Sequence, residues 1–305
     1  MSTAPNFSSY CDEYNEHGVV FMKEVLDAAT MTKVTAAYEW SHAHLTGALQ
    51  DFSASGAETF IADTNISAKR PVYQELLRDT VIPDIAHELF DVCSPVWYLG
   101  EQIFYKEGAE GTRRTPWHQD TSYGNFEGPM MAVVWIPLDP VAREHSLEVI
   151  RGSHRGVTYN GSRFAPGDDT APLYPLSELP RLPDIEQEKH KWDVAGSDLS
   201  PGDLMVFHMG ALHGGGGTPP GVRRRSLSLR FIGNDVAWVE RNDEPHPDSS
   251  NARRARAKAE GKGVAGASAG GKAAAPPGSP VWESNKFMQV RPWQPWQFAN
   301  ETINS

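Results

Sequence analysis

Three side chains with the chemistry of metal ligands stand out in the sequence. His118 and Asp120 lie in the string TPWHQDTSY, and His213 lies much later, in ALHGGGG. On an extended chain, residues i and i+2 point to the same side, so His118 and Asp120 present an imidazole and a carboxylate to one point. Two histidines and one carboxylate on one face of a metal leave further positions open, as non-haem Fe(II) oxygenases require.

The His-x-Asp tripeptide is weak evidence by itself, because such tripeptides arise often by chance. The alternative is a hydrogen-bonded polar pair with no metal. The position of His213 favours the metal site, since it follows the apolar run DLMVFHM and opens a run of four glycines. Such a run allows close approach of the backbone to a ligand, although it also fits an ordinary loop.

Arg224 is a candidate anchor for a dicarboxylate. It lies in RRRSLSLRF, where polar and apolar residues alternate as in a strand. A buried guanidinium holds a carboxylate through two parallel charge-assisted hydrogen bonds, which would fix the far end of 2-oxoglutarate. Alternation puts Ser226, Ser228 and Arg230 on the face of Arg224, and Leu227, Leu229 and Phe231 on the other. The alternative is a solvated basic patch, which we expect for Arg223 and Arg225.

Short strands are the elements that must position these residues. From about Val96, apolar runs alternate with Gly/Pro-rich segments; the runs are VWYLGEQIFYK, MMAVVWIPL, SLEVI, DLMVFHM and RSLSLRFI. Each has the length and composition of a strand. Many short strands after leading helices predict a mainly β fold, a double-stranded β-helix (jelly roll, cupin-like) core with flanking α-helices.

Two helices are predicted before the strands. Asp27 is a candidate N-cap for a helix that continues to about His44. The second helix is marked by apolar residues at i, i+3, i+4 and i+7, namely Ile82, Ile85, Ala86 and Leu89. Val19–Phe21 has the pattern of a short strand, and residues 1–17 are predicted to form a loose leader.

Two long segments lack a regular pattern. The segment from about Gly156 to Val194 is rich in proline and is predicted to be a long loop, which makes it a candidate lid. Residues 248–280 are of low complexity and cannot bury a core. We interpret them as a flexible insertion in a single domain that spans residues 1–305, with a solvated basic loop favoured over a short surface helix.

At these strings the chain resembles the phytanoyl-CoA dioxygenase-like (PhyH) family of Fe(II)/2-oxoglutarate-dependent oxygenases. The matching strings, in the family's order, are EQIFYKEGAEGTRRTPWHQDTSY, VVWIPLDP, SLEVIRGSHR, SPGDLMVFHMGALHGGGG and RRRSLSLRFIGND. The resemblance implies that His118, Asp120 and His213 are the metal ligands. It further implies that Arg224 holds the tail carboxylate of 2-oxoglutarate and that Trp135 packs beside this co-substrate. The reaction would then need Fe(II), 2-oxoglutarate and O2.

The resemblance also bears on the reaction. Halogenating relatives carry a small residue at the position of Asp120, so hydroxylation or desaturation of a C–H bond, with release of succinate and CO2, is favoured over halogenation. A family named for an acyl-CoA substrate does not make CoA the substrate here. The chain outside residues 251–280 has a net negative charge and offers no evident binding site for the phosphates of CoA. We therefore expect a small metabolite without CoA as the substrate, as in secondary metabolism.

Four further residues each have two interpretations. Gln102 shares one strand face with Phe104 and is a candidate contact to the co-substrate, or a plain inward-facing residue. Tyr123 and Phe126 are candidates for the substrate pocket, or aromatics that simply pack. His208 is interpreted as a hydrogen-bonded core histidine in preference to a fourth ligand.

Composition narrows the partners. A net charge of −11 argues against broad electrostatic binding to nucleic acid or anionic membranes. The longest uncharged apolar run, near Met130–Leu138, is about half of the ~20 residues that a membrane span needs. A secretory signal pattern is absent and two cysteines make no disulfide framework, so we expect a cytoplasmic protein. The expected partner is a small-molecule substrate, and a homodimer is possible.

Two alternatives to the oxygenase are kept. One is a metal-dependent isomerase or hydrolase on the same jelly roll, which would use a divalent ion as a Lewis acid and would not need Arg224. The other is a non-catalytic binding protein of this fold. Release of succinate under air would separate the oxygenase from the first, and failure to bind iron would favour the second.

Overall fold

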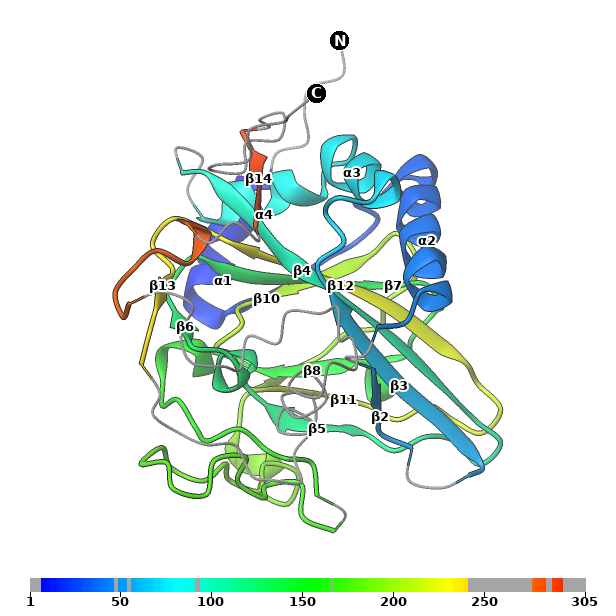
Figure 1. The fold of residues 1–305 in the computed structure, drawn as a ribbon. Helices are drawn as coiled ribbons and strands as arrows, with labels where there is room; N and C mark the ends of the chain where they lie inside the picture. Colours follow the sequence, from blue (N-terminus) through cyan, green and yellow to red (C-terminus); the bar gives the residue numbers. More distant parts are fainter. Residues whose placement is uncertain are drawn as a thin grey trace, which may run out of the picture.

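Two antiparallel sheets carry the fold, and Figure 1 shows the smaller sheet below the larger one. The computed structural model describes residues 7–46, 49–53, 56–90, 94–165, 167–240, 276–283 and 287–292. In this part of the chain the larger sheet has the strand order β1-β10-β7-β12-β4-β3-β2, with β14 beside β4. The smaller sheet has the order β5-β11-β8-β9. The predicted fold class, mainly β with flanking helices around a jelly-roll core, is confirmed.

The larger sheet consists of β1 (Val19–Met22), β2 (Gln50–Asp51), β3 (Glu58–Asn65), β4 (Val96–Gly108), β7 (Met131–Pro137), β10 (Leu204–Phe207), β12 (Arg224–Ile232) and β14 (Met288–Arg291). The smaller sheet consists of β5 (Thr115–His118), β8 (Leu147–Ile150), β9 (Val194–Ala195) and β11 (His213–Gly215). A separate ladder joins β6 (Phe126–Glu127) to β13 (Ala237–Trp238). All five strands predicted from Val96 onward are therefore present.

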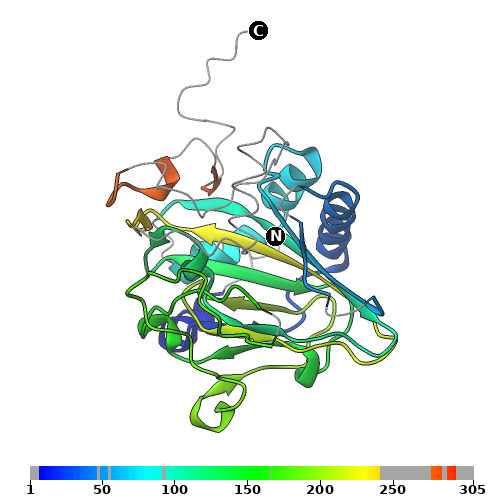
Figure 2. The same cartoon turned by 60° about the horizontal axis from the view of Figure 1, so that its bottom comes forward.

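In the described residues, four α-helices pack on the side of the larger sheet that faces away from the smaller one, where their buried side chains join one apolar core with it; they are α1 (Cys11–His17), α2 (Ala28–Ala43), α3 (Pro71–Arg78) and α4 (Ile82–Phe90). Figure 2 shows α2 and α3 side by side on this outer face. The predicted cap of α2 is confirmed, because the Asp27 carboxylate accepts a hydrogen bond from the backbone N–H of Thr30 at 2.7 Å.

The alternation along β12 separates two interiors. Leu227, Leu229 and Phe231 belong to a core between the larger sheet and the helices. The alternate residues of β12 share the opposite face, as predicted, and line a cavity between the sheets; they are Arg224, Ser226, Ser228 and Arg230. Helices thus bury one face of the sheet, and the opposite face is left to form a site.

The prediction of a loose leader over residues 1–17 is wrong for its described part. Residues 8–17 form a short 3-10 turn followed by α1. Tyr14 is 3% exposed, and its hydroxyl donates to Met131 O at 2.6 Å. This one buried tyrosine fixes α1 against β7, and a single anchoring residue leaves no periodic pattern in the sequence.

The long loop predicted between Gly156 and Val194 is confirmed, since its main regular element is a 3-10 turn at Lys189–Lys191. Its second half packs against β5, because Leu182 and Ile185 form an apolar cluster with Trp117. The Trp117 indole also donates to Glu186 Oε2 at 3.0 Å. The loop is therefore attached to the strand that carries His118.

Residues 248–275 of the predicted insertion lie outside the described residues, so the insertion and the single-domain boundary stay predictions. Trp282 follows the insertion and stacks on Trp97 of β4 with ring centroids 5.2 Å apart, so this part of the tail packs against the larger sheet. Within the described ranges, no helix combines the length and apolar character needed to cross a membrane.

Candidate metal centre

The two predicted histidine ligands face each other across paired strands of the smaller sheet. His118 ends β5, His213 begins β11, and the two are direct partners in the antiparallel register. Asp120 follows two residues later, at the start of a 3-10 turn, Asp120–Tyr123. The strand pairing therefore brings together residues that are distant in the sequence, and the extended chain of His118 to Asp120 adds the carboxylate.

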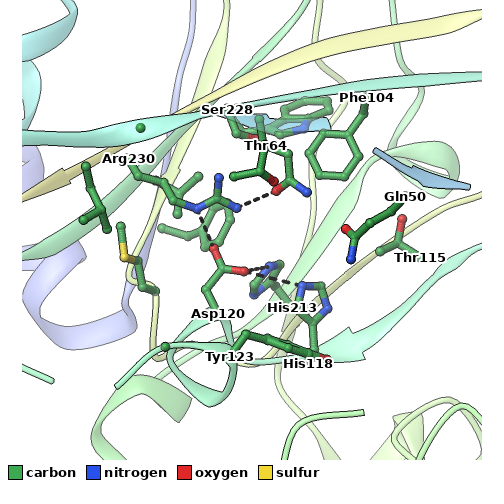
Figure 3. A pocket seen from close by; sticks show the side chains of 18 of the residues that line it. Gln50, Thr64, Phe104, Thr115, His118, Asp120, Tyr123, His213, Ser228 and Arg230 are labelled. Carbon is green, nitrogen blue, oxygen red and sulfur yellow. Dashed lines mark hydrogen bonds and ion pairs between the residues drawn. The ribbon is translucent and has the colours of Figure 1, made fainter. Parts of the chain in front are cut away.

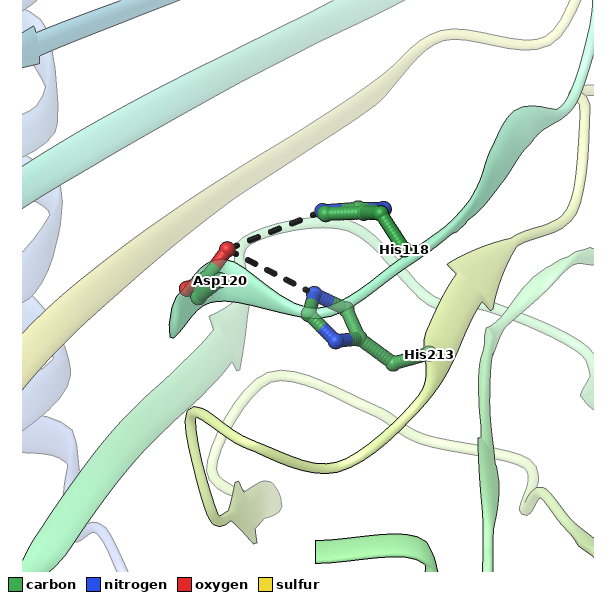
Figure 4. A group of neighbouring side chains, drawn as sticks. All are labelled: His118, Asp120 and His213. Carbon is green, nitrogen blue, oxygen red and sulfur yellow. Dashed lines mark ion pairs between the residues drawn. The ribbon is translucent and has the colours of Figure 1, made fainter. Parts of the chain in front are cut away.

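One carboxylate oxygen of Asp120 faces both imidazoles, as Figure 4 shows. Asp120 Oδ1 lies 3.6 Å from His118 Nε2 and 3.8 Å from His213 Nε2, and the three ligand atoms lie within 4.8 Å of one another. Donor atoms about 2.1 Å from one ion and at right angles to each other would be about 3 Å apart. The three side chains are thus close enough to share a cation.

Backbone carbonyls select the nitrogen that each histidine offers. His118 Nδ1 lies 2.8 Å from Pro116 O, and His213 Nδ1 lies 3.0 Å from Ala211 O. A carbonyl oxygen accepts only, so each Nδ1 carries the proton and each Nε2 keeps its lone pair. This arrangement, in which the second ring nitrogen is held by the protein, is typical of metal-binding histidines.

The charge states also suit a metal. Burial, together with the nearby His118 ring, lowers the pKa of His213 to about 3, so this imidazole is neutral at physiological pH. Burial opposes ionisation of Asp120, but the Arg230 guanidinium and the two imidazoles outweigh it and lower the pKa of this carboxyl. The site therefore offers a neutral imidazole at His213 and an anionic carboxylate at Asp120 at neutral pH.

Arg230 is a functional neighbour that the sequence analysis placed on the correct strand face without assigning it a role. Its Nε donates to Asp120 Oδ2 at 3.1 Å (Figure 3). Its Nη2 donates to Gln102 Oε1 at 2.6 Å. Nothing in the sequence signals this contact, because β12 and the Asp120 turn are far apart along the chain. Gln102 lines the cavity as predicted, but its side-chain oxygen is occupied by Arg230.

A cavity of about 230 Å³ opens on the three ligands. Every residue predicted for the site lines it: His118, Asp120, His213, Arg224, Trp135, Gln102, Tyr123 and Phe126. Trp135 is buried opposite Ser228 of β12, and the Tyr123 hydroxyl donates to Ser162 O at 2.8 Å. Phe126 packs edge-on against Trp238.

Arg224 is a buried cation with an unused donor. It is 5% exposed, its Nη1 donates to His145 O, and its Nε has no hydrogen-bond partner in the described structure. Burial, followed by the charge of Arg114, lowers the pKa of Arg224 to about 10, so it stays charged at neutral pH. A buried charge that lacks a counter-ion is costly, and the cavity beside it is where an anion would relieve that cost. Arg225, predicted to be solvated, instead pairs with Asp139 at 2.9 Å.

Lys106 is a second buried cation behind the site, and it is already satisfied. Its Nζ donates to Arg113 O and Thr115 Oγ1 at 3.1 Å and to Gly216 O at 3.2 Å. Arg224 is its direct partner in the ladder between β12 and β4. Lys106 thus links the larger sheet to the chain before His118 and the chain after His213.

The glycine run after His213 serves backbone packing. A Cβ added at Gly216 would lie 2.5 Å from His145 Cα, and one added at Gly217 would collide with Thr112 O. The run therefore lets this segment lie close to neighbouring backbone, whereas the sequence also allowed that it approaches a ligand. His208 is a core histidine as interpreted, because its Nδ1 accepts from Gly210 N–H and its Nε2 donates to Pro129 O.

One wall of the cavity was not predicted. It is formed by Gln50 and Phe52 at β2, Thr64 and Asn65 at the end of β3, and Phe164 from the long loop. Phe164 has a positive φ of 53°, which is unusual for an aromatic residue and recurs at functional sites. Its ring meets that of His118 edge-on at 5.6 Å. A phenylalanine in a proline-rich loop carries no sequence signal for this contact.

The donor set and the cavity fit an iron ion and a 2-oxo dicarboxylate. Two imidazoles and one carboxylate on one side match the facial arrangement of non-haem Fe(II) sites. The sequence profile described as phytanoyl-CoA dioxygenase (PhyH) matches residues 14–226. The chain belongs to the PhyH family.

Solved structures agree with the PhyH fold. The epimerase SnoN from nogalamycin biosynthesis, described as non-haem and α-ketoglutarate dependent, superposes with a TM-score of 0.62 at 18% identity, over 93% of this chain and 98% of SnoN. The carbocyclase SnoK from the same biosynthesis gives 0.60 at 19% identity, over 94% and 97%. EctD from S. alaskensis gives 0.56 at 19% identity, over 76% and 79%. A search of curated proteins found no match.

Membership of the PhyH family sets the class of the protein. It is an oxidoreductase, a non-haem Fe(II)- and 2-oxoglutarate-dependent dioxygenase that consumes O2. Structures of SnoN with Fe3+ and α-ketoglutarate, and of EctD with 2-oxoglutarate, are among those that match this chain. Among the described residues, the His118–Asp120–His213 cluster could hold the metal ion that this class requires.

Proposed function

We propose that this protein hydroxylates or desaturates a C–H bond of a small metabolite that carries no CoA. The observation that carries the proposal is the cavity between the sheets, which joins the His118–Asp120–His213 cluster to the guanidinium of Arg224, whose Nε has no hydrogen-bond partner in the described structure. A single ligand with a 2-oxo acid at one end and a carboxylate at the other suits both features. The family's co-substrate, 2-oxoglutarate, has this structure.

In this proposal His118, Asp120 and His213 hold Fe(II) through His118 Nε2, Asp120 Oδ1 and His213 Nε2. Arg224 binds the tail carboxylate of 2-oxoglutarate, and Trp135 packs beside the co-substrate. When bound, iron, 2-oxoglutarate and O2 supply the oxidising power for the C–H bond, and 2-oxoglutarate becomes succinate and CO2. The protein contributes orientation and the exclusion of water.

The walls of the cavity support a substrate with mixed character. Aromatic rings supply much of the lining, namely Phe52, Phe104, Tyr123, Phe126, Phe164 and Trp238. The polar groups of Gln50, Thr64 and Asn65 lie on the β2 and β3 side. An apolar lining with a few polar groups is typical of small-molecule sites.

The long loop is the proposed lid. Its second half is attached through Leu182, Ile185 and Glu186, whereas Phe164 in its first half reaches the cavity. Closure of the first half over a bound substrate would shield the reacting groups from water. A cytoplasmic location and a homodimer remain proposals from the sequence.

The matching structures show that this fold supports more than one outcome. Their names include an epimerase and a carbocyclase of one biosynthesis. These names agree with a role in secondary metabolism, which we propose for this chain too. A Lewis-acid isomerase or hydrolase is disfavoured, because it would leave the buried charge of Arg224 without use.

The proposal is tested by anaerobic titration. Protein with Fe(II) and 2-oxoglutarate should develop a weak visible charge-transfer band, and His118→Ala should abolish it. His208→Gln is the matched control, since His208 is also a buried histidine of this region, but its ring nitrogens bond to backbone groups. A band that survives in His118→Ala would refute the ligand assignment. Succinate formed above the uncoupled background, screened over metabolite pools, would then identify the substrate.

A further inference from the structure

The two oxygens of Asp120 have different partners. Oδ1 faces the two imidazole nitrogens, whereas Oδ2 accepts a hydrogen bond from Arg230 Nε at 3.1 Å. The ion pair is largely shielded, because both side chains are 15% exposed. A charge-assisted hydrogen bond in such a place is stronger and better defined than a surface pair.

The guanidinium that holds Oδ2 is itself fixed. Its Nη2 donates to Gln102 Oε1 at 2.6 Å, so Arg230 is fastened on two sides. Arg230 lies on β12, between β4 and β7, with Gly100 and Val133 as its strand partners. Gln102 lies on β4. The orientation of a carboxylate that belongs to the turn after β5 is therefore set from the larger sheet.

We infer that Arg230 is a positioning residue that, with Gln102, restricts Asp120 to presenting one oxygen to the metal. The inference rests on the proposed function. Residues that hold a ligand from behind typically change metal affinity or activity 10–100-fold when replaced. If Oδ2 were free, Asp120 could turn both oxygens toward the ion and take a position that the 2-oxo acid needs. Arg230 would thus keep the site open for the co-substrate.

Arg225 provides a matched control on the same strand. It too is largely shielded and pairs with a carboxylate, Asp139, at 2.9 Å, but this pair is not among the groups that line the cavity. Arg225→Gln therefore removes a comparable ion pair without touching Asp120. Arg230→Lys keeps the positive charge but cannot supply the two-armed hydrogen bond of a guanidinium. Comparison of these variants separates the effect of the guanidinium's hydrogen bonds from that of its positive charge and from a general loss of protein stability.

The experiment uses the full chain loaded with Co(II) under anaerobic conditions. X-ray absorption reports how the carboxylate binds the metal, and calorimetric titration gives the Kd of 2-oxoglutarate. We expect Arg230→Gln and Arg230→Lys to show a carboxylate bound through both oxygens and a Kd raised about 10–100-fold. Arg225→Gln should match the wild type in both. Gln102→Leu removes only the hydrogen bond between Arg230 and Gln102, so it should give a smaller change in both measurements. It takes the place of Arg230→Gln if that variant does not fold.

Three results would overturn the inference. The first is wild-type behaviour of Arg230→Gln and Gln102→Leu in both measurements. The second is wild-type behaviour of Arg230→Lys, which would assign the effect to charge alone. The third is an equal change in Arg225→Gln, which would assign it to general destabilisation. The absorption data report on Asp120 even if 2-oxoglutarate fails to bind the wild type, so failure of the proposed function remains distinguishable.

Discussion

Replacing Arg224 by methionine removes a buried charge and keeps an unbranched side chain. Arg224 is 5% exposed, and its Nε has no hydrogen-bond partner in the described structure, so its charge awaits a counter-ion from the cavity. Truncating one partner of a buried, hydrogen-bonded charge pair costs about 2–5 kcal/mol. Since ~1.4 kcal/mol corresponds to a factor of ten, we expect the Kd of 2-oxoglutarate to rise between about 30-fold and about 4000-fold.

The assay compares two ligands on two proteins. Calorimetric titration of the Co(II)-loaded wild type and of Arg224→Met uses 2-oxoglutarate and 2-oxopentanoate, which has the same chain but no tail carboxylate. The wild type should prefer 2-oxoglutarate by the factor given above, and Arg224→Met should lose that preference. The difference between the two preferences isolates the contact between guanidinium and carboxylate.

The reasoning fails if Arg224→Met weakens both ligands equally, because the arginine would then act on the site as a whole. It also fails if the wild type binds the two ligands equally well. Arg225→Met is the control, since Arg225 pairs with Asp139 and is not a lining residue of the cavity. Its preference for 2-oxoglutarate should be that of the wild type.

Three further outcomes follow from described contacts. Phe164→Ala opens the wall beside His118, so the ratio of succinate to oxidised substrate should rise while the Kd of 2-oxoglutarate stays unchanged; an unchanged ratio would remove Phe164 from the substrate wall. Burial lowers the pKa of His208 to about 4, so below its ordinary value of 6.5 the unfolded chain takes up a proton that the native protein does not. Between pH 7.5 and pH 5, the contribution of His208 to the free energy of unfolding, measured with urea, should fall by about 2 kcal/mol. This fall should be absent in His208→Gln. Tyr14→Phe leaves Met131 O without its donor and should lower the free energy of unfolding by about 1–3 kcal/mol, against no change if α1 is not held by this bond.

The candidate metal ligands could be found in the sequence because each has a local signal, although their assignment to one metal came from the resemblance to the PhyH family. His118 and Asp120 share a side through simple alternation, and His213 is marked by the strand before it and the glycines after it. The alternation of β12 likewise predicted which side of the strand faces the cavity. It did not predict that Arg230 meets Asp120, because that contact depends on how closely the two sheets approach.

Other misses have different causes. β3 was missed because its apolar residues run together and a buried polar residue, Asp63, interrupts them; Asp63 is satisfied by the backbone and side chain of Thr46. α3 was missed although it carries a readable signal, since Pro71 lies in its first turn and Tyr73 and Leu76 are spaced for one face. The contact of Phe164 could not be predicted, because it depends on the path of an irregular loop.

The metal ligands and the newly found wall of the cavity come from separate stretches of the chain. His118, Asp120 and His213 belong to β5, the turn after it and β11, whereas Gln50, Thr64 and Phe164 belong to the β2–β3 hairpin and the long loop. Changes in the hairpin or the loop can therefore alter which molecule is accepted while the iron-binding groups keep their positions. This division of labour would let related enzymes diversify their substrates without rebuilding the chemistry.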